Sequence, residues 1–468
     1  MSELSAVEKA IERHSYDVIP LTERHGTPKW LFFMWYGINA QIFVVATGAL
    51  GVLIGLNFWG TVLAIVVGNL VGSIFMALHS AQGPKLGLPQ MIQSRAQFGF
   101  YGSLWPLFIV WAMYVIFAAT NIVMAGQAFQ AVYHGSVNLW AAIMTIPMIL
   151  IAIFGYDWIH YGFRYATWLY SIVFIVLTIM LLVHGLPAHD LAHGKFTWGN
   201  FFLALSIYAT WQISYSPYVS DYSRYLSPNL ATHTFWATFW GTNIGSIWLM
   251  ILGAALAALN PAAQTLSAIQ GLGGHSWGTI IALLLGIGQL IPGAVNIYGG
   301  AIVTLSAGSN IRPFESTRML RSIVALVVGI LSALIAIAGS GHFMTNVENF
   351  LLFLMYFLIP WTAINLTDFY WIHRGNYKIA DLFSPKGVYG RWGWPALIVY
   401  TVTFLIEVPF MNTTVYQGPI SKALGGADIS WIIGLIVAVP LYYWADRKWG
   451  KKDAISSVLT DREPQIVE

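Results

Sequence analysis

Residues 206–226 read SIYATWQISYSPYVSDYSRYL, an apolar run interrupted by polar residues where a simple membrane anchor would continue with leucine. The interrupting residues are Gln212, Ser214, Ser216 and Pro217. Proline has no N–H group and its ring collides with the carbonyl four residues earlier, so the helix should break near Ile213. Unpaired backbone groups are tolerated at membrane depth only beside protein or a solvated cavity. The stretch therefore predicts a discontinuous transmembrane helix that lines a substrate site.

The composition around this stretch predicts a polytopic membrane protein. Of the 468 residues, 57% are hydrophobic and 9% are charged, whereas soluble domains carry about 25% charged residues. The net charge is +3 and the basic residues are scattered, so we expect no nucleic-acid partner. The chain has no cysteine, which excludes disulfides, thiolate metal sites and cysteine nucleophiles.

Twelve hydrophobic runs have about the 20 residues that are needed to cross a bilayer. They cover residues 30–56, 59–79, 104–133, 138–156, 163–185, 200–226, 233–259, 278–307, 322–340, 346–372, 393–412 and 428–446. With the N-terminus in the cytoplasm, only Lys195 and Lys422 of the 22 Lys and Arg residues lie outside. The excess of positive charge inside predicts a plasma-membrane protein with cytoplasmic tails at 1–29 and 447–468.

The first predicted span is interrupted by polar residues in the same way as the sixth. Gly37, Asn39 and Gln41 interrupt it near mid-depth, as residues 212–217 interrupt the sixth span. Interrupted spans five apart predict two five-helix repeats of opposite topology, at 30–185 and 200–372, with the spans of 393–446 outside the repeat. Asn121 and Asn296 lie near the middle of the third span of each half, which suits a shared site at the bilayer midplane.

The segment at 82–102, rich in glycine and proline, is the longest internal connection. Two interpretations remain open. It is either an ordinary cytoplasmic loop or an amphipathic segment braced under spans 1 and 6.

Four motifs carry a resemblance to a known family: GPKLGLPQMIQSRAQFGFYG at 83–102, SDYSRYL at 220–226, VNIYGGA at 295–301 and TGALG at 47–51. With them the chain resembles, over nearly its whole length, the nucleobase:cation symporter family of purine and cytosine permeases. The resemblance implies the LeuT-type fold with its five-plus-five inverted repeat. Relatives carry hydantoins, allantoin, uracil, thiamine precursors or pyridoxine, so the same fold implies several cargoes.

The resemblance also implies a substrate site on spans 1, 3, 6 and 8. It places Gln41 at the span 1 position, four residues after Gly37. The other matching residues are Tyr114, Phe117 and Asn121 in span 3 and Trp211, Gln212 and Ser214 in span 6. Gln212 stands where relatives carry an aromatic residue, which leaves Trp211 as the stacking ring. Asn39 and Asn296 complete the predicted substrate-binding set.

The spacing in span 3 agrees with a flat heterocyclic substrate. Tyr114, Phe117 and Asn121 are three and seven residues apart, which places them on one helix face. An amide both donates and accepts, which suits the mixed N–H and C=O edge of a nucleobase or hydantoin. The alternative is structural, because aromatic rings also pack between helices and Asn or Gln often only joins helices in membranes.

The coupling ion is expected to be a proton rather than sodium. Sodium-coupled relatives hold the ion between span 1 carbonyls and two adjacent hydroxyls of span 8, where this chain has Ile291 and Pro292. A cation at this position would have only the backbone carbonyls near Gly37 and Pro292 as ligands. The acidic residues in or near spans are Asp221, Glu348, Asp368 and Glu407, and intramembrane charge suggests function. Asp221 and Glu407 are the proton candidates, although Asp221 would equally pair with Arg224 as a structural latch.

The sequence thus predicts a secondary uptake transporter, a proton-coupled symporter that imports a nucleobase or nucleobase-like heterocycle, such as cytosine or a purine, by alternating access. Spans 1, 2, 6 and 7 would rock against spans 3, 4, 8 and 9. Alternatives are the same fold carrying allantoin, a hydantoin, or a vitamin or precursor such as hydroxymethylpyrimidine, thiamine or pyridoxine. A channel or membrane sensor is the alternative from another class, but no span is polar along its length. We expect a monomer in the lipid bilayer, with no cofactor, no metal and no enzymatic nucleophile or phosphate-binding loop.

Overall fold

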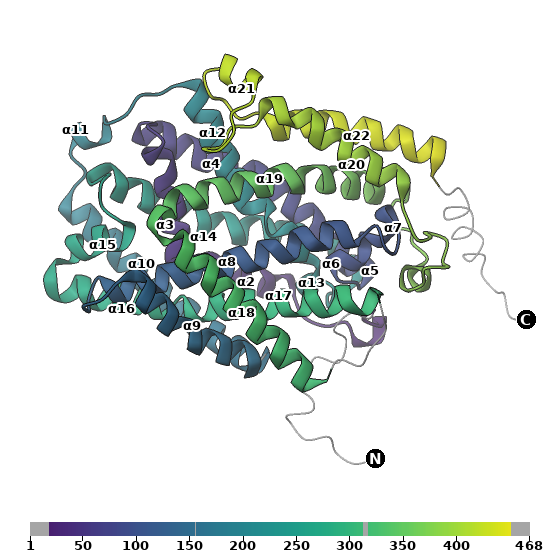
Figure 1. Ribbon diagram of the computed structural model, residues 1–468, viewed down its shortest axis with the longest axis horizontal. Coiled ribbons are helices and arrows are strands. Elements are labelled where there is room, and N and C mark those ends of the chain that lie inside the picture. The colour runs from purple at the N-terminus through teal and green to yellow at the C-terminus, as the bar shows by residue number, and fades with distance from the viewer. Residues whose placement is uncertain (1–17, 155, 312–316, 451–468) are drawn as a thin grey trace, which may run out of the picture.

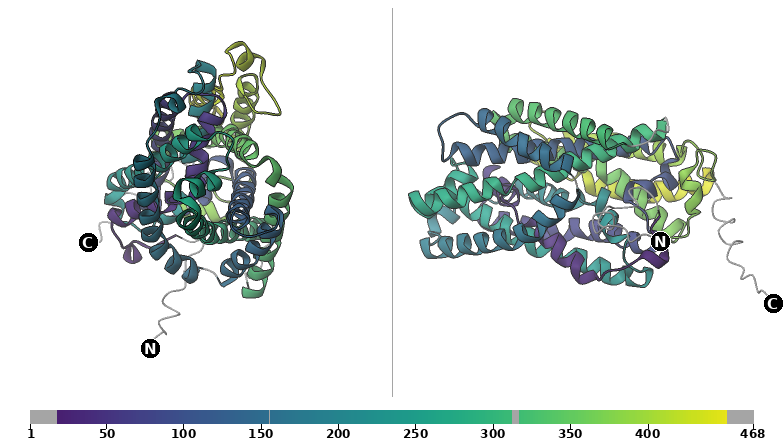
Figure 2. Two further views of the ribbon diagram at one scale, coloured as in Figure 1. Left: turned by 90° about the vertical axis from the view of Figure 1, so that its left-hand side faces the viewer. Right: turned by 90° about the horizontal axis from the view of Figure 1, so that it is seen from below.

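The computed structural model describes residues 18–154, 156–311 and 317–450. These residues form α-, 3₁₀- and π-helices, and their only β interaction is an isolated bridge between Asn412 and Gln417. Most of the long helices run along the long axis of the molecule (Figure 1 and Figure 2). The prediction of an all-helical protein is confirmed.

The long helices form the body of the molecule. They are α2 (Pro28–Asn39), α3 (Ile42–Leu53), α4 (Phe58–Ser80), α8 (Leu104–Gln130), α9 (Val137–Phe154), α10 (Tyr156–His184), α12 (Trp198–Ile213), α14 (Ala231–Leu259), α16 (Thr279–Ile287), α17 (Leu290–Ile311), α18 (Arg318–Gly339), α19 (Phe343–Thr367), α20 (Trp394–Glu407) and α22 (Ser430–Trp449).

Short helical segments connect or extend the long ones. They are η1 (Leu21–Glu23), α5 (Gln82–Leu86), α6 (Gln90–Gln93), α7 (Arg95–Phe98), α11 (Ala188–Leu191), η2 (Ser216–Tyr218), α13 (Val219–Ser223), η3 (Pro228–Leu230), α15 (Thr265–Gly273), η4 (Gly274–Gly278), η5 (Ser340–His342), η6 (Asp368–Ile372), η7 (Ile379–Phe383), η8 (Val408–Phe410) and α21 (Pro419–Ala423).

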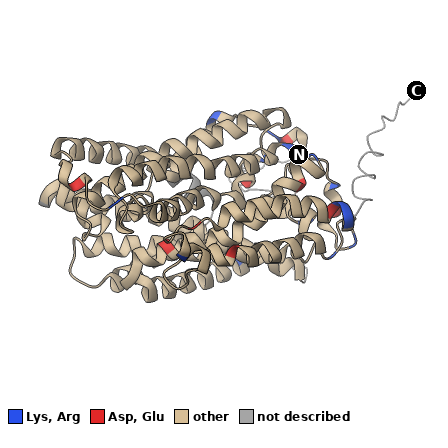
Figure 3. Cartoon of the chain, turned by 90° about the horizontal axis from the view of Figure 1, so that it is seen from above, with Lys and Arg blue, Asp and Glu red and all other residues tan. Residues whose placement is uncertain are grey.

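Several of these helices are suited to a membrane. Among the described residues, seven helices are long and apolar enough to cross it, and eight if the bent pair α2 and α3 counts as one span. Two other predicted spans are too short for this measure, α12 with 16 residues and α20 with 14, and α22, with 20 residues, is not among the qualifying helices either. Figure 3 shows long uncharged lengths of helix, with basic residues gathered mainly near the end where the described chain starts and stops.

The first predicted break is present between α2 and α3, which meet at 62°. Ala40 has φ −77° and ψ 63°, and the Gln41 N–H donates to the Asn39 carbonyl at 2.8 Å. These are the features of an inverse γ-turn. Gln41 itself is extended, with φ −143° and ψ 155°, so the helical backbone is interrupted at this residue.

The second predicted break follows Ile213, where α12 ends. The chain passes through Ser214 and Tyr215 into η2, which contains Pro217, and then into α13. Tyr218 has φ −138° and ψ 5° and so interrupts the helical backbone again. The predicted break near Pro217 is confirmed, and the chain around it is buried in protein as an unpaired backbone requires.

Most of the long helices pack into two groups. In the first group, α4, α12 and α14 pack on one another and on the broken pair α2 and α3. In the second group, α8, α9, α17 and α18 pack together. The helices α19, α20 and α22 pack on one another outside these two groups, and α19 also contacts α12. The two groups contain the spans that the sequence predicts to rock against each other.

Glycines allow the first group to pack closely. A Cβ on Gly48 of α3 would stand 2.0 Å from the carbonyl oxygen of Met250, and one on Gly253 would stand 1.8 Å from the carbonyl oxygen of Val45. Any side chain at these positions would push α3 and α14 apart. Close backbone approach through small residues is the usual way in which membrane helices associate.

The 82–102 segment is a brace rather than an ordinary loop. Gln82 and Gln90 are fully buried, and the Gln90 N–H donates to Asp221 Oδ1 at 2.8 Å. A Cβ on Gly83 would stand 2.1 Å from the hydroxyl of Ser223, so the segment lies directly against α13. The second of the two interpretations of this segment is confirmed for its contact with span 6.

Candidate substrate-binding site

Three aromatic rings meet where both broken spans approach α8. Phe43 of α3 lies 5.2 Å from Trp211 of α12, and Phe117 of α8 lies 6.3 Å from Trp211, measured between ring centroids. The ring planes are 73° and 83° apart, an edge-to-face arrangement that aromatic pairs favour. Phe350 of α19 closes the cluster at 4.9 Å from Phe117. Phe117 and Trp211 therefore present no parallel faces to a substrate in this conformation.

Tyr114 precedes Phe117 by about one turn on the same face of α8. Its ring centroid is 5.5 Å from that of Tyr218 in η2, with planes 33° apart. A Cβ on Gly299 of α17 would stand 2.6 Å from the Tyr114 ring. The ring thus fills the space between α8, the broken part of span 6 and α17.

Asn121 presents an unpaired oxygen. Its side chain is 2% exposed, and its Nδ2 donates to the Phe117 carbonyl at 2.7 Å. Its Oδ1 is buried without a hydrogen-bond partner among the described residues. Because an unsatisfied buried acceptor costs about 1–3 kcal/mol, this oxygen is well placed to accept from an N–H group of a ligand.

Gln41 has the same property in span 1. Its Nε2 donates to the Ile38 carbonyl at 3.0 Å, while its Oε1 is buried without a partner in the described part of the chain. It also borders a small cavity of about 20 Å³, room for about one water molecule. That cavity is lined by Gly37, Ile38, Ala40, Gln41, Ala166, Thr167, Tyr170, Gly288, Ile291 and Pro292.

The side chains of Asn296 and Ser214 both donate hydrogen bonds to backbone carbonyls of their own segments. Asn296 is half-buried and its Nδ2 donates to the Pro292 carbonyl at 3.0 Å. The Ser214 hydroxyl donates to the Trp211 carbonyl at 2.7 Å and helps to close the end of α12. The Asn296 Oδ1 atom has no hydrogen-bond partner within the described ranges of the chain.

Gln212, a predicted substrate contact, is hydrogen-bonded to three neighbouring side chains. Its Nε2 donates to Asn69 Oδ1 at 2.6 Å and to the Ser246 hydroxyl at 2.7 Å, and its Oε1 accepts from the Thr242 hydroxyl at 2.6 Å. Neighbouring side chains on a helix point about 100° apart. Because Trp211 faces α8, Gln212 turns toward α4 and α14 and has no group left for a substrate.

Asn39 is likewise paired inside the first group of helices. Its Oδ1 accepts from Trp211 Nε1 at 2.8 Å, and its Nδ2 donates to the Trp35 carbonyl at 2.8 Å and to the Thr242 hydroxyl at 3.0 Å. Asn39 is therefore a positioning residue that fixes the Trp211 ring. Sequence reasoning missed Thr242, which joins the Asn39 and Gln212 amides, because nothing in its local sequence marks it.

The candidate cation positions surround the small cavity beside Gln41. Gly37 and Pro292 both line it, as the sequence suggested. Sequence reasoning missed Thr167 of α10, whose hydroxyl oxygen would lie 2.4 Å from a Cβ placed on Gly37. Among the described residues, no three His, Asp or Glu side chains are grouped to hold a metal ion.

Glu407 lies away from the aromatic cluster, between α20 and α22. Its side chain is fully buried, and neither carboxylate oxygen has a hydrogen-bond partner among the described residues. A Cβ on Gly434 would stand 1.8 Å from one of these oxygens, so the carboxyl group occupies the space that this glycine leaves.

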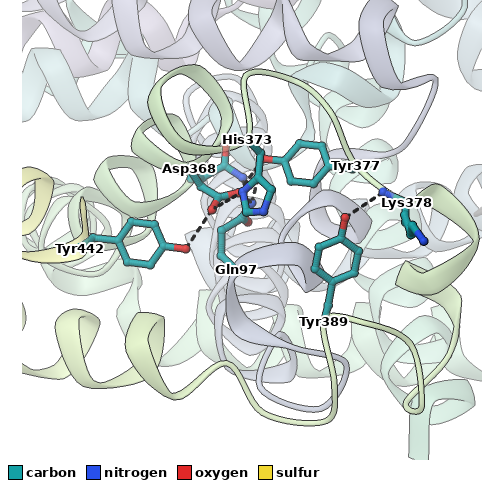
Figure 4. Close-up of polar contacts among 8 residues, drawn as sticks. Gln97, Asp368, His373, Tyr377, Lys378, Tyr389 and Tyr442 are labelled. Carbon is teal, nitrogen blue, oxygen red and sulfur yellow. Dashed lines mark hydrogen bonds and ion pairs between the residues drawn. The ribbon is translucent and has the colours of Figure 1, made fainter. Parts of the chain in front are cut away.

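Asp368, directly after the last residue of α19, accepts hydrogen bonds from several neighbours. Its Oδ2 accepts from Gln97 Nε2 at 2.7 Å and from the Tyr377 hydroxyl at 2.6 Å, and its Oδ1 accepts from the Tyr442 hydroxyl at 3.0 Å (Figure 4). His373 Nδ1 lies 3.0 Å from Oδ1. Burial lowers the pKa of His373, but the neighbouring Asp368 carboxylate outweighs burial and leaves this pKa raised. The arrangement is a buried polar cluster, in which His373 and Asp368 form an ion pair when the histidine is protonated.

A chain of side-chain amides joins this polar cluster to span 6. The Ser220 hydroxyl donates to Gln90 Oε1 at 2.6 Å, and Gln90 Nε2 donates to Gln82 Oε1 at 3.1 Å. Gln82 Nε2 donates to Asn365 Oδ1 at 2.9 Å, and Asn365 Nδ2 donates to Gln97 Oε1 at 3.2 Å. The brace thereby connects α13 to α19.

The chain matches a known protein family over most of its length. The family model described as a permease for cytosine/purines, uracil, thiamine and allantoin matches residues 18–434. The chain belongs to this family. The permease is 41% identical over 438 residues to YxlA of Bacillus subtilis, provisionally described as a purine-cytosine permease, covering 92% of this chain and 95% of YxlA. It is 24% identical over 465 residues to the purine-cytosine permease fcyB of Emericella nidulans, covering 93% of this chain and 88% of fcyB.

A solved structure shares the fold of this permease. The inward-facing conformation of Mhp1 superposes with a TM-score of 0.76 at 18% identity, covering 97% of this chain and 98% of Mhp1. Mhp1 is a nucleobase-cation-symport-1 family transporter. The predicted family, the membrane transporter fold and the expectation of a permease rather than an enzyme are confirmed.

Proposed function

We propose that this permease is a symporter that imports a nucleobase, such as cytosine or a purine, by alternating access. The observation that carries the proposal is the unpaired Asn121 oxygen beside the Phe117 and Trp211 rings. A ring surface combined with a buried acceptor fits a flat base that carries N–H groups. The family model and the names of the two relatives support the same class of cargo.

The proposed site contains two acceptors and a stacking surface. Gln41 and Asn121 would accept from the base, and Trp211 and Phe117 would contact its faces after their edge-to-face contact opens. Tyr114, Ser214 and Asn296 would border the site, while Asn39 and Gln212 would support it from behind. A site built on acceptors strongly rejects analogues that lack the matching donors, because its polar groups then stay unpaired.

The proposed architecture is the twelve-span arrangement with inverted repeats at 30–185 and 200–372 and two further spans in 393–446. Both ends of the described chain lie at the same end of the bundle (Figure 1), which supports cytoplasmic tails on one side of a plasma membrane. Residues 1–17 and 451–468 of these tails lie outside the described residues. We propose that the protein works as a monomer.

The proposed coupling ion is the proton. Ile291 and Pro292 border the cavity beside the span 1 break, and neither offers a side-chain oxygen to sodium. Asp221, at the inner end of the broken sixth span, is the first proton candidate, and Glu407 is the second although it lies outside the site.

Uptake assays test the proposal. Cells that express the permease would take up labelled cytosine or adenine above the level of empty-vector cells, and unlabelled cytosine, adenine or hypoxanthine would compete. Uptake of labelled allantoin, pyridoxine or hydroxymethylpyrimidine, without uptake of nucleobases, would instead assign the vitamin or allantoin alternative. Expression measured in the same membranes is the control.

A further inference from the structure

A second cavity lies at the outer end of α8, beyond the proposed site. It measures about 270 Å³, close to the lower end of about 300 Å³ for ligand pockets. The residues that line it come from α8, the start of α15 and the connection from α18 to α19, and are Met124, Gln127, Gln264, Thr265, Ser340, Gly341, His342, Phe343, Met344 and Thr345. In Figure 1, α15 lies at the end of the bundle opposite the described chain ends.

The lining carries polar groups that the protein itself does not use. Gln127 is 6% exposed, yet its amide makes no hydrogen bond within the part of the chain that the structure describes. The side chains of Thr265 and Thr345 are also without a hydrogen-bond partner among the described residues, whereas the Ser340 hydroxyl donates to Asn138 Oδ1 at 2.7 Å. The Gln127 side chain lines the cavity and therefore offers it an amide donor and acceptor that no group of the described residues occupies.

The cavity continues the proposed site along one helix. Met124 and Gln127 follow Asn121 by three and six residues on α8, which corresponds to about 4.5 and 9 Å along the helix axis. Met124 is on the same helix face as Asn121. α15, which supplies another wall, packs against α3 and α14 of the first helix group. A molecule in the cavity would therefore lie on the outer side of Asn121, between parts of both groups.

We propose that this outer cavity is a second binding site for the transported heterocycle, occupied before the central site. This inference rests on the proposed function. The lining contains amide, hydroxyl and imidazole groups but no Lys, Arg, Asp or Glu, so it suits a neutral ring with N–H and C=O edges. Phe343 and the methionines supply the apolar contact surface for such a ring.

Cysteine protection tests the outer site directly. The natural chain has no cysteine, so Thr345→Cys introduces a single thiol at the cavity wall. In purified protein, cytosine at about ten times its dissociation constant should slow the maleimide labelling of this thiol by about tenfold, because about nine sites in ten are then occupied. Leu21→Cys is the control, since Leu21 is 70% exposed in η1 near the start of the described chain, which lies at the end of the bundle opposite α15; its labelling should not change.

The decisive arm combines Thr345→Cys with Asn121→Ala, which weakens the central site. Protection that persists in this background supports a separate outer site. Protection that disappears with Asn121, or that is absent in both backgrounds, overturns it. Asn121→Leu replaces the alanine variant if that variant does not elute as a folded protein.

Uptake measured with the same proteins separates the two proposals. Cytosine uptake without protection overturns the outer site alone. The absence of nucleobase uptake overturns the proposed function and this inference together. Gln127→Leu should raise the KM for uptake several-fold, and an unchanged KM would also count against the outer site.

Discussion

At the scale of single residues, the orphan oxygen of Asn121 leads to the first prediction. Asn121→Ala removes the acceptor and leaves a substrate N–H unpaired, at a cost of about 1–3 kcal/mol, or about 5- to 150-fold in kcat/KM. Initial uptake rates at several substrate concentrations measure this loss of kcat/KM. Thr120→Val is the matched control, because the Thr120 hydroxyl bonds only to the Ile116 carbonyl of its own helix. Wild-type uptake in Asn121→Ala would remove α8 from the site.

The second prediction at this scale concerns Gln212. Gln212→Leu leaves the Asn69 oxygen and the Thr242 and Ser246 hydroxyls without their partner, so the variant should unfold at a lower Tm. Substrate should still raise the Tm of the folded variant, because Gln212 points away from the site. Thermal unfolding with and without cytosine measures both effects. A normal Tm combined with loss of the cytosine effect would return Gln212 to the substrate contacts.

At the scale of elements, the third prediction concerns the attachment of η6 to α22 and to the 373–393 connection. The groups that face His373 are Asp368, Asp446, Tyr377, Tyr389 and Tyr442. A histidine whose folded pKa is raised contributes stability that is complete below its unfolded pKa of about 6.5 and is lost as pH rises through the folded pKa. The Tm should therefore be higher near pH 6 than near pH 8.5. In His373→Gln this difference should shrink, and an unchanged difference would assign it to other groups.

At the scale of the whole molecule, the fourth prediction concerns the coupling ion. Uptake should rise as external pH falls and should not change when sodium is replaced by choline, because Ile291 and Pro292 offer no hydroxyl to sodium. Transport in cells or proteoliposomes with imposed ion gradients measures this. Loss of uptake in choline would instead assign a sodium site built from backbone carbonyls and the Thr167 hydroxyl.

The two breaks were predictable from local features of the sequence. Pro217 cannot donate a backbone hydrogen bond, and the polar residues around Gly37 interrupt an apolar run, so both signals act within one helical turn. The pairing of Gln212 with Asn69 was not predictable, since these residues are far apart in the chain. The same limit applies to the cavity between α8 and α15.

The sequence by itself determined a helical membrane protein, its family, and the positions at which spans 1 and 6 break, because apolar length and backbone chemistry are local properties. Only the tertiary structure decided which amides remain free. Asn121, Gln41, Gln212 and Asn39 are similar polar residues at similar depth, but neighbouring helices satisfy the last two completely and leave an oxygen on each of the first two. Hydrogen-bond satisfaction depends on partners that folding brings together, and this separates a binding group from a structural one.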